Sequence, residues 1–124
     1  MLRAKDIMTP EVVTISEEAS VAEAIELMRE EAVRCLIVEP VEEYEPYGIV
    51  TQRDICYKVI AESLDPAEVK VAEVMSQPLV LVSPNFRINQ VAKLMANTRL
   101  SRLPVIFNGK LQGIVSVTDV VDSV

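Results

Sequence analysis

The segment GIVTQRDI at residues 48–55 returns 65 residues later as GIVSVTDV at residues 113–120. Each copy begins with glycine and two β-branched residues, continues with Thr or Ser, and places Asp three positions after that hydroxyl. A second pair of segments, DIMT at 6–9 and EVMS at 73–76, repeats with a spacing of 67 residues. Two separate segments that repeat at nearly one spacing indicate two copies of one supersecondary unit.

Further identities keep the 67-residue register, and the register slips by two residues only between 39–47 and 106–112. A slip confined to one place indicates one loop of different length. We therefore divide the chain into a first repeat, residues 1–64, and a second repeat, residues 65–124, and expect the functional site in a pseudo-twofold cleft between them. The identities are Val13 with Val80, Ser16 with Ser83, Leu27 with Leu94, Met28 with Met95, Leu36 with Leu103 and Val38 with Val105.

The size and composition of the chain indicate one small aliphatic module. Each repeat has about 60 residues, which is marginal for burying enough surface alone, so we expect the repeats to fold against each other. Apolar residues make up 50% of the chain and aromatic residues only 4%. The core is therefore expected to consist of Val, Ile, Leu, Ala and Met.

We expect a cytoplasmic protein without a membrane span. No run approaches the roughly 20 apolar residues that a membrane-spanning helix needs, and the start, MLRAKD, lacks the apolar region of a signal peptide. Cys35 and Cys56 form neither a metal-ligand pair nor a disulfide framework. We interpret them as reduced thiols that serve packing rather than redox chemistry.

The net charge of −7 is unevenly distributed along the chain. Residues 1–69 hold 16 acidic and 6 basic side chains, a net charge of −10, whereas residues 70–124 hold 3 acidic and 6 basic, a net charge of +3. The acidic total argues against nucleic-acid binding, which needs a basic face; RNA or DNA binding by the second repeat is the weakest hypothesis. We expect an anionic ligand near the second repeat, and pairing of first half with second half in a homodimer. Drift of surface charge without function is the alternative.

The residue pattern predicts strand, helix, strand, strand, helix in each repeat. A capping-box pattern begins at Ser20, and an apolar stripe with helical spacing follows it. Asn108-Gly109 predicts a tight hairpin turn. The predicted strands include 12–15, 35–38, 79–82, 103–106 and 111–115. Predicted helices begin near residues 21, 88 and 117, and a further helix covers 52–63, with Ile55, Val59 and Ile60 pointing inward. The linker between the repeats is predicted at residues 64–67.

The repeated Thr/Ser-x-x-Asp element has two interpretations. Thr51 with Asp54, and Ser116 with Asp119, match a helix N-terminal capping box. Alternatively, a carboxylate at a helix start accepts two hydrogen bonds from a vicinal diol such as a ribose, and nearby backbone N–H groups hold a phosphate. The presence of the element in two symmetry-related places, each opened by one of only three glycines, favours the ligand interpretation.

The ordered set of motifs resembles the cystathionine-β-synthase (CBS) domain, and the chain resembles a free-standing pair of such domains, a Bateman module. The matching segments are 6–9, 48–54, 103–105 and 113–119, within about residues 4–124. The resemblance implies an α/β (α+β) fold of two β-α-β-β-α repeats related by a pseudo-twofold axis, with sheets packed face to face and helices outside.

The resemblance also implies a function. Such pairs bind an adenosyl compound (AMP, ADP, ATP, S-adenosylmethionine, sometimes NAD) in the cleft between the repeats, dimerise into a flat disc and regulate an enzyme, channel or transporter. Because no catalytic domain is attached, the regulated partner is expected to be a separate protein.

Carrying the family's positions across implies two pockets. In the first, Asp119 holds the ribose and Arg102 the phosphate, with Ser116 beside them; Thr9, Val13, Val33 and Cys35 line the base side. In the second, Thr51 and Asp54 act with Arg34 or Arg53, and Ser76, Val80, Leu100 and Arg102 line the pocket. Cys35 stands at the place of Arg102, and Ile37 at the place of Pro104, which weakens the phosphate site of the first repeat. The alternative to ligand binding is that Arg34 and Arg102 are solvated charges at strand ends and that the Cys35 side chain only packs in the fold.

The loop 39–47 contains Glu39, Glu42, Glu43 and Glu45 with Tyr44 and Tyr47. A solvated hairpin tip is the simplest interpretation, and a divalent-cation site or a docking loop are the alternatives, since clustered carboxylates suit hard cations.

We expect no enzymatic activity. The chain has no histidine, no phosphate-binding glycine loop and no activated nucleophile. A ligand-sensing regulatory module is the leading hypothesis, and a constitutive dimeric scaffold without a nucleotide ligand is the alternative.

Overall fold

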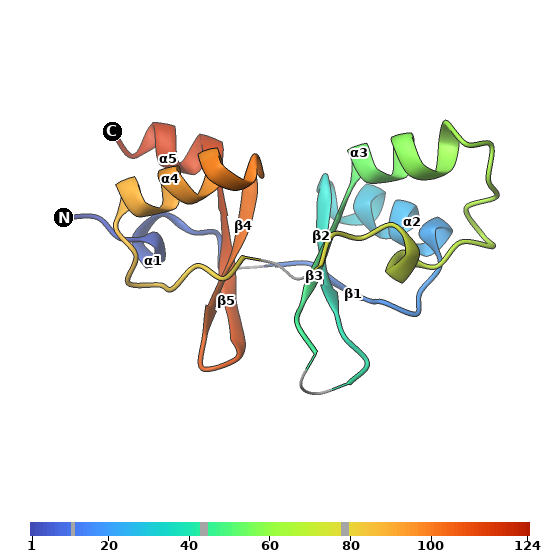
Figure 1. Ribbon diagram of the computed structural model, residues 1–124, viewed down its shortest axis with the longest axis horizontal. Coiled ribbons are helices and arrows are strands. Elements are labelled where there is room, and N and C mark those ends of the chain that lie inside the picture. The colour runs from blue at the N-terminus through green and yellow to red at the C-terminus, as the bar shows by residue number, and fades with distance from the viewer. Residues whose placement is uncertain (11, 43–44, 78–79) are drawn as a thin grey trace. The chain divides into compact units, whose positions relative to one another are not determined.

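The computed structural model describes residues 1–10, 12–42, 45–77 and 80–124. Glu43 and Tyr44 of the predicted loop, and Leu79 of the predicted strand 79–82, lie outside the described residues. The chain forms two compact units (Figure 1). The Asp54 unit is Val13–Leu79, and the Asp119 unit is Met1–Val12 together with Val80–Val124.

The Asp54 unit contains a three-stranded sheet in the order β1-β2-β3. Strand β1 (Thr14–Ser16) runs parallel to β2 (Cys35–Glu39), which pairs antiparallel with β3 (Gly48–Thr51). Helix α2 (Val21–Glu31) begins at the predicted cap, where the Glu23 N–H donates to Ser20 Oγ at 3.1 Å. Its buried stripe of Val21, Ala24 and Met28 packs with Leu36 and Val38 of β2 in one aliphatic core.

The Asp119 unit repeats this plan with a smaller sheet. Strands β4 (Arg102–Phe107) and β5 (Lys110–Ser116) form an antiparallel pair, and Asn108 and Gly109 make the predicted two-residue turn with φ of 53° and 74°. Helices α4 (Ile88–Thr98) and α5 (Val117–Asp122) follow the predicted positions. Val91, Met95, Leu103, Val105 and Val115 form the core. The mixed α/β fold with two similar repeats is therefore confirmed.

The predicted strand at 79–82 is wrong for its described residues, which form only an isolated parallel bridge between Val82 and Val105. Val82 N–H donates to Pro104 O, and Ile106 N–H donates to Val82 O, at 3.2 and 2.9 Å. Pro84 follows two residues later and has no N–H to extend the ladder. The Asn85 N–H donates to Ser83 Oγ, which turns the chain away from the sheet.

The helix predicted over 52–63 is shorter and changes type. An α-helical turn, α3 (Gln52–Ile55), passes into a π-helical turn, Cys56–Ile60, and Ser63 has a left-handed φ of 57°. Ile55 and Val59 are buried as predicted, but the prediction for Ile60 is wrong, since its side chain is 55% exposed. Val59 and Ile60 are neighbours in the π-helical turn and therefore point in different directions, so Ile60 turns away from the face that Val59 buries.

Each unit takes its leading segment from the other sequence repeat. Helix α1 (Ala4–Ile7) and Thr9 belong to the Asp119 unit: the Ala4 N–H donates to Phe86 O, and Thr9 and Ile114 exchange two backbone hydrogen bonds. The 3₁₀ turn Val71–Glu73 and Ser76 belong to the Asp54 unit, where Ser76 and Ile49 exchange the equivalent pair. The compact units therefore do not coincide with the sequence repeats 1–64 and 65–124.

The motif glycines allow these exchanged segments to approach. A Cβ added at Gly113 would lie 2.7 Å from Thr9 O and 2.9 Å from Met8 Sδ, and a Cβ at Gly48 would lie 2.7 Å from Met75 Sδ. The GIV motif of each repeat thus packs against the Met-Thr or Met-Ser motif of the other. The two glycines have a packing role, which the ligand interpretation of the sequence did not include.

Candidate functional site

In the Asp119 unit, β5 ends at Ser116, which caps α5. The Asp119 N–H donates to Ser116 Oγ at 3.1 Å, and the Ser116 N–H donates to Asp119 Oδ2 at 2.8 Å. This is the predicted capping box, with both reciprocal bonds present. Asp119 remains partly exposed at the strand–helix junction.

Two further predicted site residues lie at the same junction. Arg102 is the direct antiparallel partner of Ser116, and the side chains of directly opposed residues lie on one face of a sheet. Thr9 is bridged to Ile114, two residues before Ser116. The fold therefore brings a cation, two hydroxyls and a carboxylate to one end of the β4–β5 hairpin.

The Asp54 unit has an equivalent capping box with more bonds. Thr51 donates to Asp54 Oδ2 through its N–H at 2.9 Å and through Oγ1 at 3.0 Å, while the Asp54 N–H donates to Thr51 Oγ1 at 3.1 Å. Cys35 is the direct partner of Thr51, as Arg102 is of Ser116. Ser76 is bridged to Ile49, in the place that Thr9 has beside Ile114.

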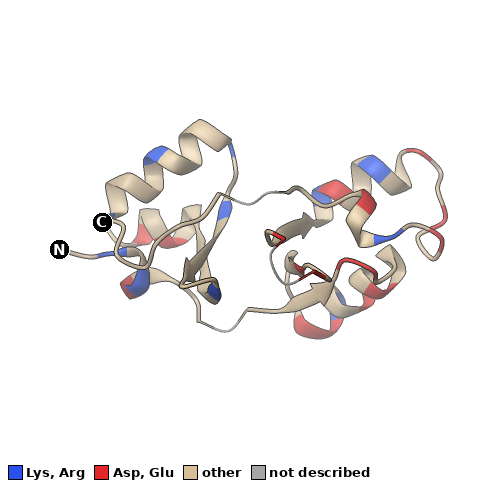
Figure 2. Ribbon diagram, turned by 60° about the horizontal axis from the view of Figure 1, so that its bottom comes forward, with Lys and Arg blue, Asp and Glu red and all other residues tan. Residues whose placement is uncertain are grey.

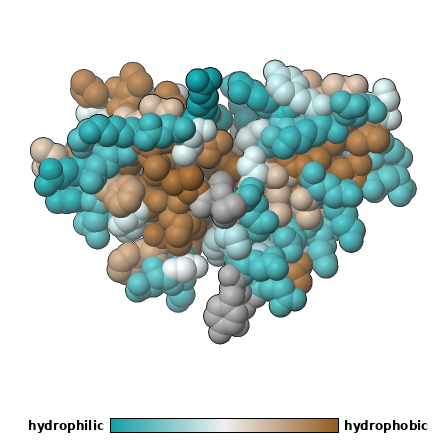
Figure 3. Space-filling view, in the orientation of Figure 1, coloured by the Kyte–Doolittle hydropathy of each residue, from teal (hydrophilic) through white to brown (hydrophobic). Residues whose placement is uncertain are grey.

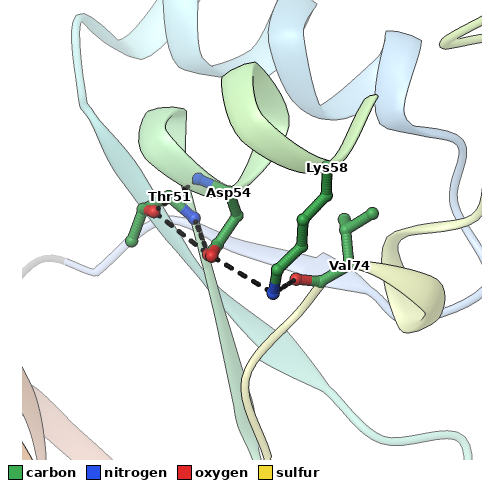
Figure 4. Close-up of polar contacts among 4 residues, drawn as sticks. All are labelled: Thr51, Asp54, Lys58 and Val74. Atoms are coloured by element: carbon green, nitrogen blue, oxygen red, sulfur yellow. Dashed lines mark hydrogen bonds and ion pairs between the residues drawn. The ribbon is translucent and has the colours of Figure 1, made fainter. Parts of the chain in front are cut away.

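Lys58, which was not among the predicted site residues, also lies at this site. Its ammonium lies 3.4 Å from Asp54 Oδ1 and donates to Val74 O at 2.9 Å (Figure 4). The signal was available, because an acidic residue four positions before a lysine on a helix is a recognised ion-pair spacing.

The remaining predicted residues fall into the two units as follows. Val80 and Leu100 belong with Arg102, Ser116 and Asp119, while Val13, Val33, Arg34, Cys35, Arg53 and Ser76 belong with Thr51 and Asp54. The Arg34 carbonyl accepts the Gln52 N–H at 3.0 Å, which places Arg34 beside the start of α3. The resemblance had placed Thr9, Val13, Val33 and Cys35 together in the pocket of Asp119; Thr9 belongs to the compact unit of Asp119, and the other three belong to the Asp54 unit. Whether any of these residues binds a ligand stays a prediction.

The two units differ strongly in net charge. The Asp54 unit contains 15 acidic and 5 basic residues, a net charge of −10, and the Asp119 unit contains 4 acidic and 7 basic, a net charge of +3. Acidic side chains accordingly predominate on the Asp54 unit (Figure 2). Among the described residues, none of the helices has the length and apolar character needed to cross a lipid bilayer.

Comparison with known proteins agrees with this architecture. The CBS-domain profile matches residues 4–61 and 71–124, so the chain belongs to the CBS-domain family, as a tandem pair. The CBS domain-containing protein YhcV of Bacillus subtilis is 36% identical over 96% of this chain and 83% of its own length. Protein MK0525 of Methanopyrus kandleri is 34% identical over 93% of this chain, which spans 59% of that relative's length.

A solved structure of similar fold is the hexameric CBS-CP12 protein from bloom-forming cyanobacteria. It superposes with a TM-score of 0.92 at 50% sequence identity, over 97% of this chain and 66% of its own. Both the fold and the pairing of two CBS repeats are therefore shared with proteins of known structure, and at least one such relative is an oligomer.

Proposed function

We propose that this CBS pair is a non-catalytic regulatory module that binds an adenosyl compound, AMP, ADP, ATP or S-adenosylmethionine, and controls a separate partner protein. The observation that carries the proposal is the meeting of Arg102, Ser116 and Asp119 at one strand–helix junction. A cation beside a carboxylate matches a ligand that contains both a phosphate and a vicinal diol.

The contacts at Asp119 support this assignment of roles. A carboxylate has about four acceptor positions, and Asp119 gives one of them to the Ser116 N–H. The rest can accept both hydroxyls of a ribose, in charge-assisted hydrogen bonds. Arg102 provides the guanidinium that binds phosphate oxygens with two parallel hydrogen bonds.

The regulatory mechanism would be a population shift. A ligand that contacts both repeats favours one arrangement of the module, and a partner protein reads that arrangement. Coupling energies of this kind are typically about 1–3 kcal/mol. The absence of histidine from the sequence supports a non-catalytic role, because the commonest general base is missing.

We also propose that two copies pair through their helices. In the Asp119 unit, α4 and α5 border a groove of about 430 Å³ lined by apolar residues including Met95, Leu100 and Val121; apolar side chains gather over α5 in Figure 3. In the Asp54 unit, Tyr57, Ile60 and Leu64 are exposed. The opposite net charges of the units favour the Asp54 unit of one copy against the Asp119 unit of its partner.

A scaffold without a nucleotide ligand is the second candidate. It is favoured by the capping boxes themselves, since Asp54 and Asp119 already have a structural task at the helix starts. Under this alternative, Asp119→Asn lowers stability and changes no ligand response.

A thermal-shift panel separates the two candidates. The protein and its Asp119→Ala variant are melted with AMP, ADP, ATP, S-adenosylmethionine, NAD and GMP. A ligand at 100 times its Kd stabilises the fold by about 2.7 kcal/mol, which is a shift of several degrees for a domain of this size. We expect a shift with at least one adenosyl compound that is lost in Asp119→Ala. No shift with any compound would favour the scaffold.

A further inference from the structure

The two repeated carboxylates differ in how many of their acceptor positions the protein already uses. Asp54 Oδ2 accepts two hydrogen bonds from Thr51, and Oδ1 faces the Lys58 ammonium at 3.4 Å. Asp119 accepts one hydrogen bond, from the Ser116 N–H, among the residues that the structure describes. Thr51 therefore fills two of the about four acceptor positions of Asp54, and the ion pair with Lys58 covers the other carboxylate oxygen, whereas Asp119 has one position filled.

Lys58 is held in place by a second contact. Its ammonium also donates to the Val74 carbonyl at 2.9 Å, so it joins the π-helical turn to the exchanged segment of the Asp54 unit. The Asp54 side chain is only 16% exposed, whereas that of Lys58 is 48% exposed. A partly buried carboxylate with a fixed cation is a stronger pair than two solvated charges.

The Asp119 unit has no equivalent of this lysine. The residue four positions after Asp119 is Ser123, whose hydroxyl donates to Val120 O at 2.6 Å. Within the described ranges, Lys58 with Asp54 is the single ion pair. In ion pairing the two sites therefore differ by one side chain, Lys58 against Ser123, and this adds to the differences of Cys35 against Arg102 and of Thr51 against Ser116.

We propose that Lys58 is a specificity-determining residue that blocks the Asp54 site, so that the chain binds one adenosyl ligand, at Asp119. A vicinal diol donates two hydrogen bonds, and Asp54 cannot accept both while Lys58 and Thr51 are in place. The inference rests on the proposed function, because it concerns which of the two repeated sites takes the diol.

Isothermal titration with AMP, ATP and S-adenosylmethionine tests this inference in four proteins: the wild type, Lys58→Met, Ser123→Lys and the control Lys93→Met. Lys93 lies on α4 and is exposed, and its side chain makes no polar contact with another described residue. We expect one equivalent of at least one of these ligands per chain in the wild type and in Lys93→Met. Lys58→Met should bind two equivalents, because Asp54 Oδ1 is released. Ser123→Lys should weaken binding about tenfold, because the new ammonium pairs with Asp119.

The outcomes separate the inference from the proposed function. Two equivalents in the wild type, or a single equivalent in Lys58→Met with its fold intact by circular dichroism, would overturn the role of Lys58. Loss of affinity in Lys58→Met would also overturn it and make Lys58 a phosphate ligand. No binding of any of the three compounds to any of the four proteins would contradict the proposed function itself, and the inference with it.

Discussion

At the scale of single residues, the repeated motif has two structural roles: its hydroxyl and carboxylate cap a helix, and its glycine makes room for a neighbouring segment. The Thr/Ser-x-x-Asp part forms a capping box in both units, as predicted. The glycine before it provides room for the Met-Thr or Met-Ser segment that the other repeat contributes. The glycines at these two positions therefore have a packing role that is independent of any ligand, against backbone at Gly113 and mainly against a side chain at Gly48.

The two glycines are expected to tolerate alanine unequally. At Gly113 the new methyl group meets the Thr9 carbonyl oxygen at 2.7 Å, and backbone moves only with its whole segment. At Gly48 the nearest atom is Met75 Sδ, at the end of a flexible side chain. Overpacking costs about 1–3 kcal/mol, and we expect Gly113→Ala near the top of this range and Gly48→Ala near the bottom. Urea unfolding of both variants checks this order, and an equal or reversed order would contradict the packing account.

The contact between Lys58 and the Val74 carbonyl is a part of the site that could not be predicted from single residues. The resemblance implied that Arg102 acts with Ser116, and the antiparallel register of β4 with β5 accounts for this pairing. The pairing of Cys35 with Thr51 was not predicted, because Cys35 was expected on the base side of the Asp119 pocket. The contact of Lys58 with the Val74 carbonyl joins residues 16 positions apart. It depends on the π-helical turn, and no residue pattern in the sequence specified that turn.

At the scale of elements, local patterns predicted most of the fold. The stripe from Val21, the turn at Asn108-Gly109 and the two capping boxes each depend on neighbouring residues, and each is confirmed. The two failures have causes in the nearby sequence that the residue pattern did not take into account. Pro84 limits the predicted strand 79–82 to the single bridge between Val82 and Val105, and Ile60 follows Val59 directly, so that both cannot face the core.

The exchange of leading segments could not be predicted from the repeat. Because the two repeats carry similar motifs, the sequence does not determine whether a leading segment packs with its own repeat or with the other one. Ala4 is fully buried in the core of the Asp119 unit, and Val71, at the equivalent position 67 residues later, is fully buried in the core of the Asp54 unit. The first segment of the chain therefore stabilises the last part of it.

A matched pair of variants tests this exchange. Ala4→Glu and Val71→Glu each place a charge in a dry core, at a cost of about 3 kcal/mol. We expect hydrogen–deuterium exchange to rise in β4 and β5 for Ala4→Glu, and in β2 and β3 for Val71→Glu. The opposite assignment, with Ala4→Glu exposing β2 and β3 first, would show that each repeat keeps its own leading segment.

At the scale of the whole molecule, the division of charge suggests how copies assemble. The units have net charges of −10 and +3, and each presents exposed apolar side chains on its helices, at Ile60 in one unit and Val121 in the other. A homodimer that sets unlike units together lowers the repulsion between its copies. A dimer of like units would place two strongly acidic surfaces face to face.

Charge complementation tests the orientation of the proposed dimer. Ile60→Asp alone and Val121→Lys alone are each expected to shift the protein towards monomer in sedimentation velocity. In a dimer of unlike units, mixing the two variants sets the introduced carboxylate of one chain against the introduced ammonium of the other. The mixture should therefore recover the dimer, more strongly at low salt. If the mixture stays monomeric while the wild type dimerises, pairing of like units is supported instead.

The central claim is that Asp119 holds the ribose diol of an adenosyl ligand, and a ligand–residue cycle tests it most directly. AMP and 2′-deoxyadenosine monophosphate, which lacks one hydroxyl of the diol, are titrated into the wild type and Asp119→Ala. We predict that the wild type binds the deoxy compound about tenfold more weakly, the worth of one charge-assisted hydrogen bond, and that this difference disappears in Asp119→Ala. Equal affinity of the wild type for both compounds, or a preference for AMP that persists in Asp119→Ala, would contradict the claim.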